Sequence, residues 1–533
     1  MITRLRFYAL MFVVLGCLPV RAEQERPNIL FFFSDDLTTQ AISAYNYGLD
    51  LPPTPNIDRI AKEGMLFENS FCGNSICTPS RATVMTGLHS HKNGIVNLAG
   101  ALDPDRPTWP KALQKNGYTT AIFGKWHMKT KPTGFDAWEV FSGQGSYYNP
   151  DLYSATGSRR IEGHSTEVVT DIALEWLDKR DKSKPFALMV QHKAPHRNWK
   201  PSLKELELYK DTVFPEPDSL FDDYKTRVSA ANHKMGIDAD MRMASDLMLF
   251  DTESDLNVVN RLTDAQRKAY VAAFEEENKH FLANPPTGKD LVRWKYQRYM
   301  RNYLRCVAGV DRNVGRVLDR LDELGLSKNT LVVYCADQGF YLGEHGWFDK
   351  RWAYEESLKM PLIVRWPGKV TPGTRAKAMV QNIDYAPTFL AAAGIQTDWD
   401  VHGISFLPIL TNGGVTPAGW RDTIYYRYVD GGHGMPKHSA IRTDTHKLLY
   451  FDHPRNTAES ENRWELFDLA KDPKEMNNLA KNADYASLLS ALQERFWKTR
   501  EFYDDTDESI WDSPARNKYP QETQIRSART RPR

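Results

Sequence analysis

Short, continuous apolar runs that lead directly into polar side chains constrain this 533-residue chain more than any other feature of its sequence. Such runs, continuous and not alternating, are typical of strands buried on both faces of a parallel sheet. Because parallel strands end at the same edge of a sheet, the pattern predicts an α/β fold with its site along that edge. The runs are 28–33, 119–123, 186–190 and 331–334, and they lead into Asp35 and Asp36, Lys125 and His127, His192 and His196, and Asp337 and Gln338.

The order of the other elements predicts how the chain is divided. Apolar residues between 303 and 324 recur at steps of three and four, which predicts a helix that Gly325 ends. A charge-rich helical insertion is expected at about 201–293, where Thr263 and Gln266 have the spacing of a capping box. Short strands are expected at 424–429, 439–442 and 447–451, with a last helix around 485–497. We therefore predict a large N-terminal domain (23–412), a small antiparallel C-terminal subdomain (413–511) and a polar tail (512–533).

The N-terminus has the layout of an export signal. Arg4 and Arg6 precede the apolar run 7–20, and Ala22 follows as a small residue. The run is too short to span a membrane, so we predict a signal peptide at 1–22 and a periplasmic or secreted protein with no membrane span. The alternatives are a buried N-terminal helix and a lipoprotein anchor at Cys17.

Charge and cysteine content exclude other classes of protein. The chain has 69 basic and 68 acidic residues, so no overall field would steer it to nucleic acid, and no such partner is expected. Beyond the signal, four scattered cysteines do not form a disulfide framework, although one bridge remains open.

Cys77 lies at the start of a helix-like segment. Pro79 near its start and Gly87 past its end predict a short helix directly after Cys77. A helix N-terminus favours a bound anion and lowers the pKa of a thiol. From these residues alone, Cys77 is either a nucleophile or an inert core side chain.

The motif Cys77-Thr78-Pro79-Ser80-Arg81 resembles the signature of type I sulfatases, whose cysteine is converted to formylglycine. The resemblance extends from about residue 26 to 479, and it implies the fold of the alkaline phosphatase superfamily: a large, mostly parallel sheet flanked by helices, with a small C-terminal antiparallel sheet. The other matching motifs, in the family's order, are Asp35-Asp36, Gly124-Lys125-Trp126-His127, Ala194-Pro195-His196, Asp337-Gln338-Gly339 and the closing segment from Glu465 to Leu479.

The resemblance implies one calcium ion. Its ligands would be Asp35, Asp36, Cys77 as formylglycine, Asp337 and Gln338. Oxygen ligands of this kind suit a hard cation, although Asp35-Asp36 alone would favour a helix cap. Many relatives carry asparagine at the position of Gln338, and either amide oxygen can ligate.

The resemblance also implies catalytic roles. Hydrated formylglycine would attack sulfur, while Arg81, Lys125 and Lys350 stabilise the developing charge. Lys350 is matched through the segment Phe348-Asp349-Lys350-Arg351. His196 would protonate the leaving oxygen, and His127 would accept the proton that allows sulfate to leave. A formylglycine-generating enzyme is the implied partner.

Segments 192–199 and 343–352 look like those of bacterial exo-acting sulfatases that remove 6-O-sulfate from N-acetylglucosamine in glycosaminoglycan-type glycans. A sulfated carbohydrate is therefore the expected substrate. Trp199, Trp347, Trp352 and Tyr354 form either a sugar-stacking rim or part of the core. Alternatives are another sugar position such as iduronate 2-sulfate, a phosphate or phosphonate ester hydrolase, or an inactive glycan binder. The expected substrate-binding residues are His192, Trp199, His345, Trp347, Arg351 and Trp352.

Overall fold

The computed structural model describes residues 26–250, 261–452 and 463–506. The expected signal peptide, the alternative anchor at Cys17 and the tail 512–533 lie outside these residues. Within the described residues, no helix has the length and apolar character needed to cross a membrane.

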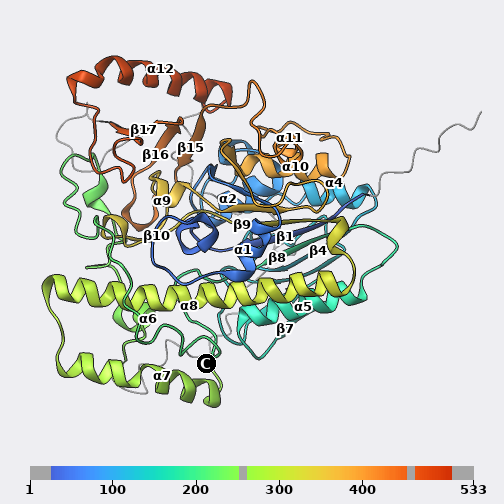
Figure 1. The fold of residues 1–533 in the computed structure, drawn as a ribbon, viewed down its shortest axis with the longest axis horizontal. Helices are drawn as coiled ribbons and strands as arrows, with labels where there is room; N and C mark the ends of the chain where they lie inside the picture. Colours follow the sequence, from blue (N-terminus) through green and yellow to red (C-terminus); the bar gives the residue numbers. More distant parts are fainter. Residues whose placement is uncertain (1–25, 251–260, 453–462, 507–533) are drawn as a thin grey trace, which may run out of the picture.

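A ten-stranded mixed sheet forms the centre of the molecule (Figure 1). The four strands expected from the apolar runs lie side by side and parallel in the order β9-β1-β8-β4, which confirms the prediction. β5 continues the parallel part, while β12 and β6 pair antiparallel with its edges. In sheet order the strands are β13 (Thr374–Ala376), β2 (Met65–Phe67), β12 (Leu362–Arg365), β9 (Thr330–Ala336), β1 (Asn28–Ser34), β8 (Phe186–Gln191), β4 (Thr119–Gly124), β5 (Ala137–Phe141), β6 (Asp151–Ser154) and β7 (Gly157–Arg160).

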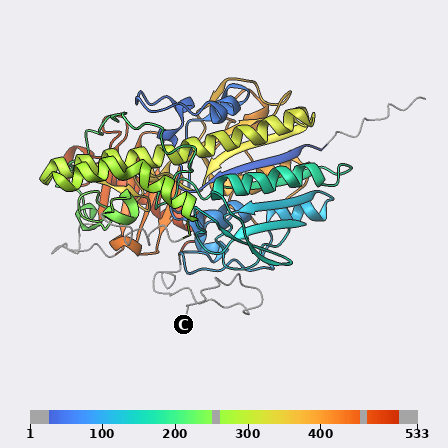
Figure 2. The same ribbon diagram turned by 90° about the horizontal axis from the view of Figure 1, so that it is seen from below.

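Helices cover both faces of this sheet, so its central strands are buried (Figures 1 and 2). Phe31 of β1 packs edge-on against Trp109 and Phe389 on one face. On the other face, Leu30 lies in the same apolar cluster as Val310. A strand with apolar residues at successive positions supplies both of these cores, which explains its continuous pattern. The first face carries α2 (Cys77–Thr86), α4 (Trp109–Lys115) and α10 (Tyr385–Ala392), and the second carries α1 (Pro55–Lys62), α5 (Ser165–Lys179) and α8 (Gly288–Glu323).

The predicted helix at 303–324 is the C-terminal part of the longer helix α8, and Gly325 follows it with a φ of 68°. The capping box is confirmed: Thr263 Oγ1 accepts from Gln266 N and Gln266 Oε1 accepts from Thr263 N at the start of α7 (Asp264–Ala283). The expected insertion is less helical than predicted. Its described part before α7 contains only α6 (Met243–Leu247) and one short 3-10 turn, and its expected end at 293 falls inside α8.

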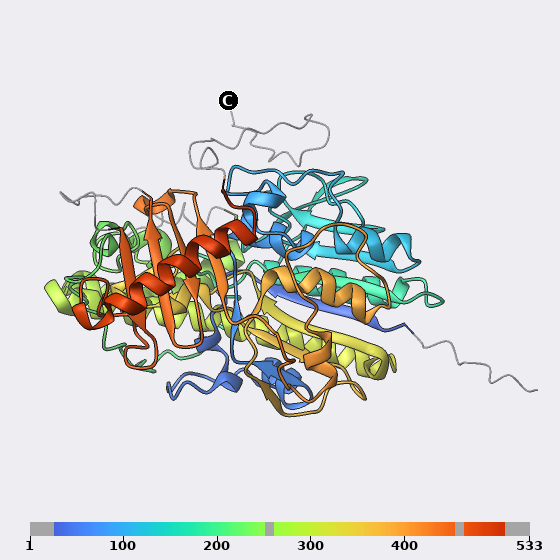
Figure 3. The same ribbon diagram turned by 90° about the horizontal axis from the view of Figure 1, so that it is seen from above.

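The C-terminal region forms a separate four-stranded antiparallel sheet, as expected. Its strands lie in sequence order, and α12 crosses one face of the sheet (Figure 3). Phe496 of α12 is buried in a cluster with Tyr425 and Leu448 of the strands. The elements are β15 (Ile424–Tyr428), β16 (His438–Arg442), β17 (His446–Phe451), β18 (Trp464–Asp468) and α12 (Ala486–Phe502).

Short elements connect these parts. Two of the strand pairs lie outside the large sheets, and β10-β11 precedes the loop that carries Lys350. These elements are β3 (Ser70–Phe71) with β14 (Val380–Gln381), β10 (Tyr341–Leu342) with β11 (Phe348–Asp349), α3 (Ser90–Asn93), α9 (Glu355–Leu358) and α11 (Leu407–Thr411).

Candidate active site

Polar side chains from four strands meet at the carboxyl edge of the central sheet, as the sequence predicted. Ser34 of β1 lies opposite Ala336 of β9, and Asp337 N donates to Ser34 O at 3.1 Å. This register sets Asp35 beside Asp337. The edge also receives the residues that follow β4 and β8. The parallel arrangement thus gathers residues far apart in sequence into one buried site.

Three carboxylates converge at this edge. Asp35, Asp36 and Asp337 are fully buried, and each offers one oxygen within 4.8 Å of the others'. Burial raises the pKa of Asp36 to about 6 and that of Asp337 to about 7. For Asp35 burial also raises the pKa, but the charges led by Lys125 outweigh it and hold the pKa well below its usual range. The site therefore concentrates negative charge that a cation would stabilise.

Each carboxylate has a cationic partner among the predicted residues. Arg81 donates to Asp337 Oδ2 from Nε at 3.1 Å and from Nη2 at 3.0 Å. Lys350 Nζ donates to both oxygens of Asp36, at 2.6 and 2.5 Å. Lys125 Nζ donates to Asp35. Arg81, Lys125 and Lys350 are thus brought together as the sequence predicted, around a centre where an anionic ester would bind.

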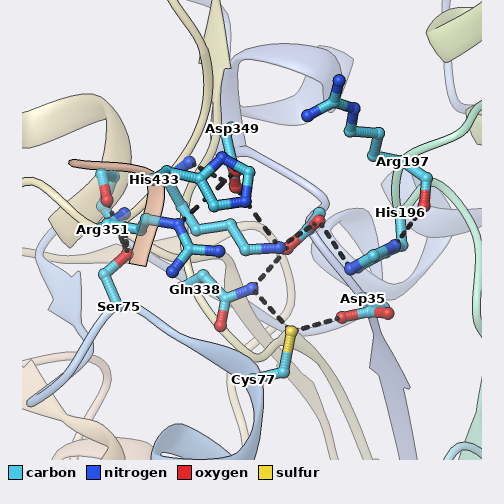
Figure 4. A network of polar contacts seen from close by, with 12 residues as sticks. Asp35, Ser75, Cys77, His196, Arg197, Gln338, Asp349, Arg351 and His433 are labelled. Atoms are coloured by element: carbon cyan, nitrogen blue, oxygen red, sulfur yellow. Dashed lines mark hydrogen bonds and ion pairs between the residues drawn. The ribbon is translucent and has the colours of Figure 1, made fainter. Parts of the chain in front are cut away.

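Gln338 completes a set of oxygen donors. Its Nε2 donates to Asp36 and lies 3.9 Å from Cys77 Sγ (Figure 4). Its Oε1 is buried and has no hydrogen-bond partner among the described residues. An unpartnered buried amide oxygen is costly, and a bound hard cation would satisfy it. Three carboxylates with this amide therefore fit a hard divalent cation.

Cys77 is the first residue of α2, and not the residue before the helix as expected. Its Sγ lies 3.4 Å from Asp35 Oδ1. Burial, with the charge of Asp35, raises the pKa of the thiol to about 12. The expectation that the helix N-terminus lowers this pKa is therefore wrong, because desolvation outweighs the helix dipole. An unmodified thiolate is disfavoured here.

The two expected catalytic histidines flank the carboxylates. His196 Nε2 lies 3.7 Å from Asp36 Oδ2, while its Nδ1 hydrogen-bonds the carbonyl oxygen of Arg197. Its ring therefore presents Nε2 to the site, whereas the guanidinium of Arg197 points away (Figure 4). His127 has a φ of 55°, and its Nδ1 lies 3.5 Å from Thr78 Oγ1. Burial lowers the pKa of both histidines.

A second polar group borders the site and includes residues that the sequence did not assign. Arg351, which was expected, lies 3.5 Å from Asp349 and donates to Tyr428 OH at 3.1 Å. His433 lies 3.4 Å from Asp349 (Figure 4). Asp349 directly precedes Lys350, so its position in the sequence could have identified it as a site residue. His433 comes from a loop of the C-terminal region, and nothing local marked it.

The prediction of an aromatic rim that stacks on the sugar is wrong. Trp199, Trp347 and Tyr354 are 0% exposed and Trp352 is 1% exposed. Trp199 packs against Tyr299 with ring centroids 4.4 Å apart. Side chains without accessible surface cannot stack on a sugar, so these four belong to the core, which was the alternative.

Two expected histidine contacts are also corrected. His192 and His345 are both fully buried. His192 Nε2 pairs with Thr170 Oγ1 at 3.1 Å, and His345 Nδ1 pairs with Asp222 at 2.8 Å. One ring nitrogen of each histidine is held by the protein, while His192 Nδ1 and His345 Nε2 are buried without a hydrogen-bond partner among the described residues. Because neither ring has accessible surface, both residues belong to the interior and are not predicted to contact a sugar. All four described cysteines are free, so the possible bridge is absent among them.

This fold is that of sulfatases. Residues 27–395 match the family described as Sulfatase, which is more than half of the chain, so the chain belongs to that family and is a sulfuric ester hydrolase. Residues 343–502 also match the C-terminal region of N-sulphoglucosamine sulphohydrolase.

Individual relatives narrow this likeness. The N-acetylglucosamine-6-O-sulfatase of Bacteroides thetaiotaomicron is 42% identical, over 92% of this chain and 89% of the relative. The N-acetylglucosamine-6-sulfatase of Homo sapiens is 26% identical, over 80% of this chain and 72% of the human protein. The solved structure of BT4656 with its substrate D-glucosamine-2-N,6-O-disulfate has a TM-score of 0.87 and 42% identity, and it covers 91% of this chain and 99% of its own.

Proposed function

We propose that this sulfatase removes 6-O-sulfate from N-acetylglucosamine in glycosaminoglycan-type glycans by exo action. The main support for this substrate is the 42% identity with an N-acetylglucosamine-6-O-sulfatase over 92% of the chain. The site's chemistry agrees, because Arg81, Lys125 and Lys350 act electrostatically on Cys77. His196 presents Nε2 toward the same centre.

A calcium ion would be held by Asp35, Asp36, Asp337, Gln338 and residue 77. The oxygen-rich donor set and the unpartnered Oε1 of Gln338 support this assignment. When bound, the ion would supply positive charge against the anionic sulfate.

Cys77 would act after conversion to formylglycine, which supplies a hydrated aldehyde as the nucleophile. Because the pKa of the unmodified thiol is about 12, the side chain without this conversion would be a poor nucleophile. His127 would take up a proton at the ring nitrogen that does not face Thr78. Arg81, Lys125 and Lys350 would stabilise the charge that develops on the sulfate oxygens.

His196 would donate a proton from Nε2 to the leaving oxygen. Burial lowers the pKa of His196, and the nearby negative charge of Asp35 opposes this shift. A bound sulfate ester brings a further negative charge next to the ring, which favours the protonated form. The general acid would therefore be charged mainly in the presence of substrate.

Relative kcat/KM values test the proposed substrate. N-acetylglucosamine 6-sulfate should be hydrolysed faster than iduronate 2-sulfate and far faster than N-acetylglucosamine 6-phosphate. A preference for iduronate 2-sulfate would show that the enzyme acts on a different sulfated position of the glycan. A preference for the phosphate ester would contradict the proposed sulfate ester substrate. Mass spectrometry of the peptide containing Cys77, from native material, would show whether the thiol is converted.

Export and a modifying enzyme belong to the same proposal. The layout of residues 1–22 supports a cleaved signal peptide, and conversion of Cys77 requires a formylglycine-generating enzyme as a transient partner. N-terminal sequencing of the mature protein should begin near Glu23. A lipid-modified Cys17 at the mature N-terminus would favour the anchor instead.

A further inference from the structure

A cavity of about 320 Å³ opens beside His196, between the loop at 144–148 and the segment that follows β8. It is far larger than one sulfate group. Four of its lining residues carry basic side chains, and none carries a carboxylate among the residues that the structure describes. The basic residues are Lys193, Arg197, Lys200 and Arg261.

Lys193 differs from the arginines of this cavity in its partners. Arg197 donates to Asp246 at 2.9 and 2.6 Å, and Arg261 forms an ion pair with Asp151 at 2.7 Å. The ammonium of Lys193 lies 5.0 Å from the centre of the Tyr147 ring. Within the described parts of the chain it has no carboxylate partner and no hydrogen-bond acceptor.

The environment of Lys193 is unfavourable for a charge without a counterion. The residue is 5% exposed. Burial, followed by repulsion from Lys125, lowers the pKa of Lys193 to about 7. The negative charges of Asp35 and Asp36 oppose this shift, but neither forms an ion pair with Lys193. The ammonium lines the cavity beside the Tyr147 ring, so its donors can bind an anion that enters the cavity. The three cations around Cys77 each have a carboxylate partner, whereas Lys193 lines the cavity without an ion-pair partner among the described residues.

We propose, resting on the proposed function, that this cavity binds a second anionic group of the same glycan, and that Lys193 determines this specificity. The second group is a sulfate or carboxylate other than the ester that is hydrolysed at Cys77. Two sources have this chemistry: an N-sulfate on the same glucosamine, or the carboxylate of a neighbouring uronic acid. Tyr147 connects the cavity to the catalytic centre, because its hydroxyl donates to His196 O at 2.6 Å.

Three substrates separate these sources: N-acetylglucosamine 6-sulfate, D-glucosamine-2-N,6-O-disulfate, and a disaccharide in which a uronic acid follows N-acetylglucosamine 6-sulfate. Lys193→Met keeps most of the side-chain volume and removes the charge. The ratio of kcat/KM for a substrate with a second anion to that for the monosulfate should fall roughly ten- to a hundredfold, the effect of one charge-assisted hydrogen bond. The substrate whose ratio falls identifies the source of the anion.

Controls keep the proposal falsifiable. Lys193→Arg should retain the ratio, and Lys369→Met removes one exposed lysine charge after β12 without touching the cavity. Should Lys193→Met fold poorly, as its melting temperature would show, Lys193→Gln takes its place. Equal losses on all three substrates, or no change in either ratio, would overturn the proposal.

Binding provides a readout that does not depend on turnover. In a Cys77→Ala background, calorimetry should show tighter binding of at least one doubly anionic sugar than of the monosulfate, and Lys193→Met should remove that preference. A wild-type enzyme without activity on any 6-sulfate would contradict the proposed function, while the binding preference would still test the cavity. Equal affinities for all three sugars would overturn the cavity's role.

Discussion

Two buried clusters of charge in this protein have different designs. At the catalytic edge, the oxygens of Asp35, Asp36 and Asp337 converge on a common point. Between α9 and the C-terminal sheet, the charges alternate: Lys447 lies 3.0 Å from Glu355 and 2.8 Å from Glu475. We call this second group, Glu355, Arg442, Lys447, Glu465 and Glu475, the interface cluster.

This difference in charge arrangement indicates that the catalytic edge is built to bind a ligand, whereas the interface cluster holds chain segments together. In the interface cluster, Glu355 also pairs with Arg442 at 3.2 Å, and Glu465 accepts from Tyr354 OH at 2.8 Å. Its carboxylates are taken up by partners on different chain segments. The carboxylates at the catalytic edge also have cationic partners, but their oxygens lie close to one another and the amide oxygen of Gln338 has no partner among the described residues. We expect changes at the first cluster to alter activity and changes at the second to alter stability.

Cys77→Ala should give the largest effect, a complete loss of sulfate ester hydrolysis with little change in melting temperature. The substitution is small, so the fold should lose only about 1 kcal/mol. Cys72→Ala is the matched control, because Cys72 is equally buried but lies outside the carboxylate centre. Full activity of Cys77→Ala would contradict the assignment of residue 77 as the nucleophile.

His196→Ala should lower kcat on N-acetylglucosamine 6-sulfate on the order of a hundred- to ten-thousandfold, the usual contribution of a general acid. An activated aryl sulfate has a better leaving group and should lose far less. His192→Ala is the control, and its losses should be equal on both substrates, because His192 is buried against Thr170. A selective loss in His192→Ala would show that the acid is assigned to the wrong histidine.

Lys447→Met should destabilise the fold by roughly 3–5 kcal/mol, because it leaves Glu355 and Glu475 buried without their shared cation. Urea unfolding would measure this loss, and kcat of the folded fraction should stay near the wild-type value. Adding Glu475→Gln should restore part of the stability. A variant with normal stability and reduced kcat would erase the proposed division between the two clusters.

The interface cluster should also make stability depend on pH through Glu465. Burial raises the pKa of this carboxyl to about 7, above the value near 4.3 expected in the unfolded chain. Its contribution to stability is therefore fully present below about pH 4.3 and is lost as pH rises through 7. The stability difference between wild type and Glu465→Gln should fall by at most about 4 kcal/mol over this range. A difference that stays constant with pH would refute this expectation.

The smallest expected effect is stabilisation by calcium, which should depend on the catalytic carboxylates and not on the interface cluster. At a hundredfold excess over Kd, a bound ion stabilises the folded state by about 2.7 kcal/mol, so the melting temperature should rise with calcium and fall with a chelator. Asp337→Ala should abolish this response, and Glu475→Gln should retain it. Active enzyme without any metal in elemental analysis would contradict the assignment.

The sequence predicted the strands, helix ends and caps whose structure depends on neighbouring residues. Continuous apolar runs identified β1, β4, β8 and β9, and the polar residues after them identified the catalytic edge. Spacing also predicted the helix before Gly325 and the capping box at Thr263.

The errors arise where burial depends on contacts between distant segments. Nothing in the sequence near Trp347 shows that its ring stacks on Tyr354 inside the core. The pKa of Cys77 follows from desolvation by the whole fold, and not from its place at a helix start. His433 reaches Asp349 from a loop more than eighty positions later in the sequence.

The burial of Cys77 has a consequence for how the enzyme matures. The residue is 1% exposed, and every residue of α2 around it is buried. The proposed modifying enzyme would therefore have to reach the thiol while the chain is still open. β9, which closes the site, ends 259 residues after Cys77, and synthesis at 5–20 residues per second takes roughly 10–50 s for that stretch. Conversion would thus compete with folding, and a chain that closes first would remain permanently inactive.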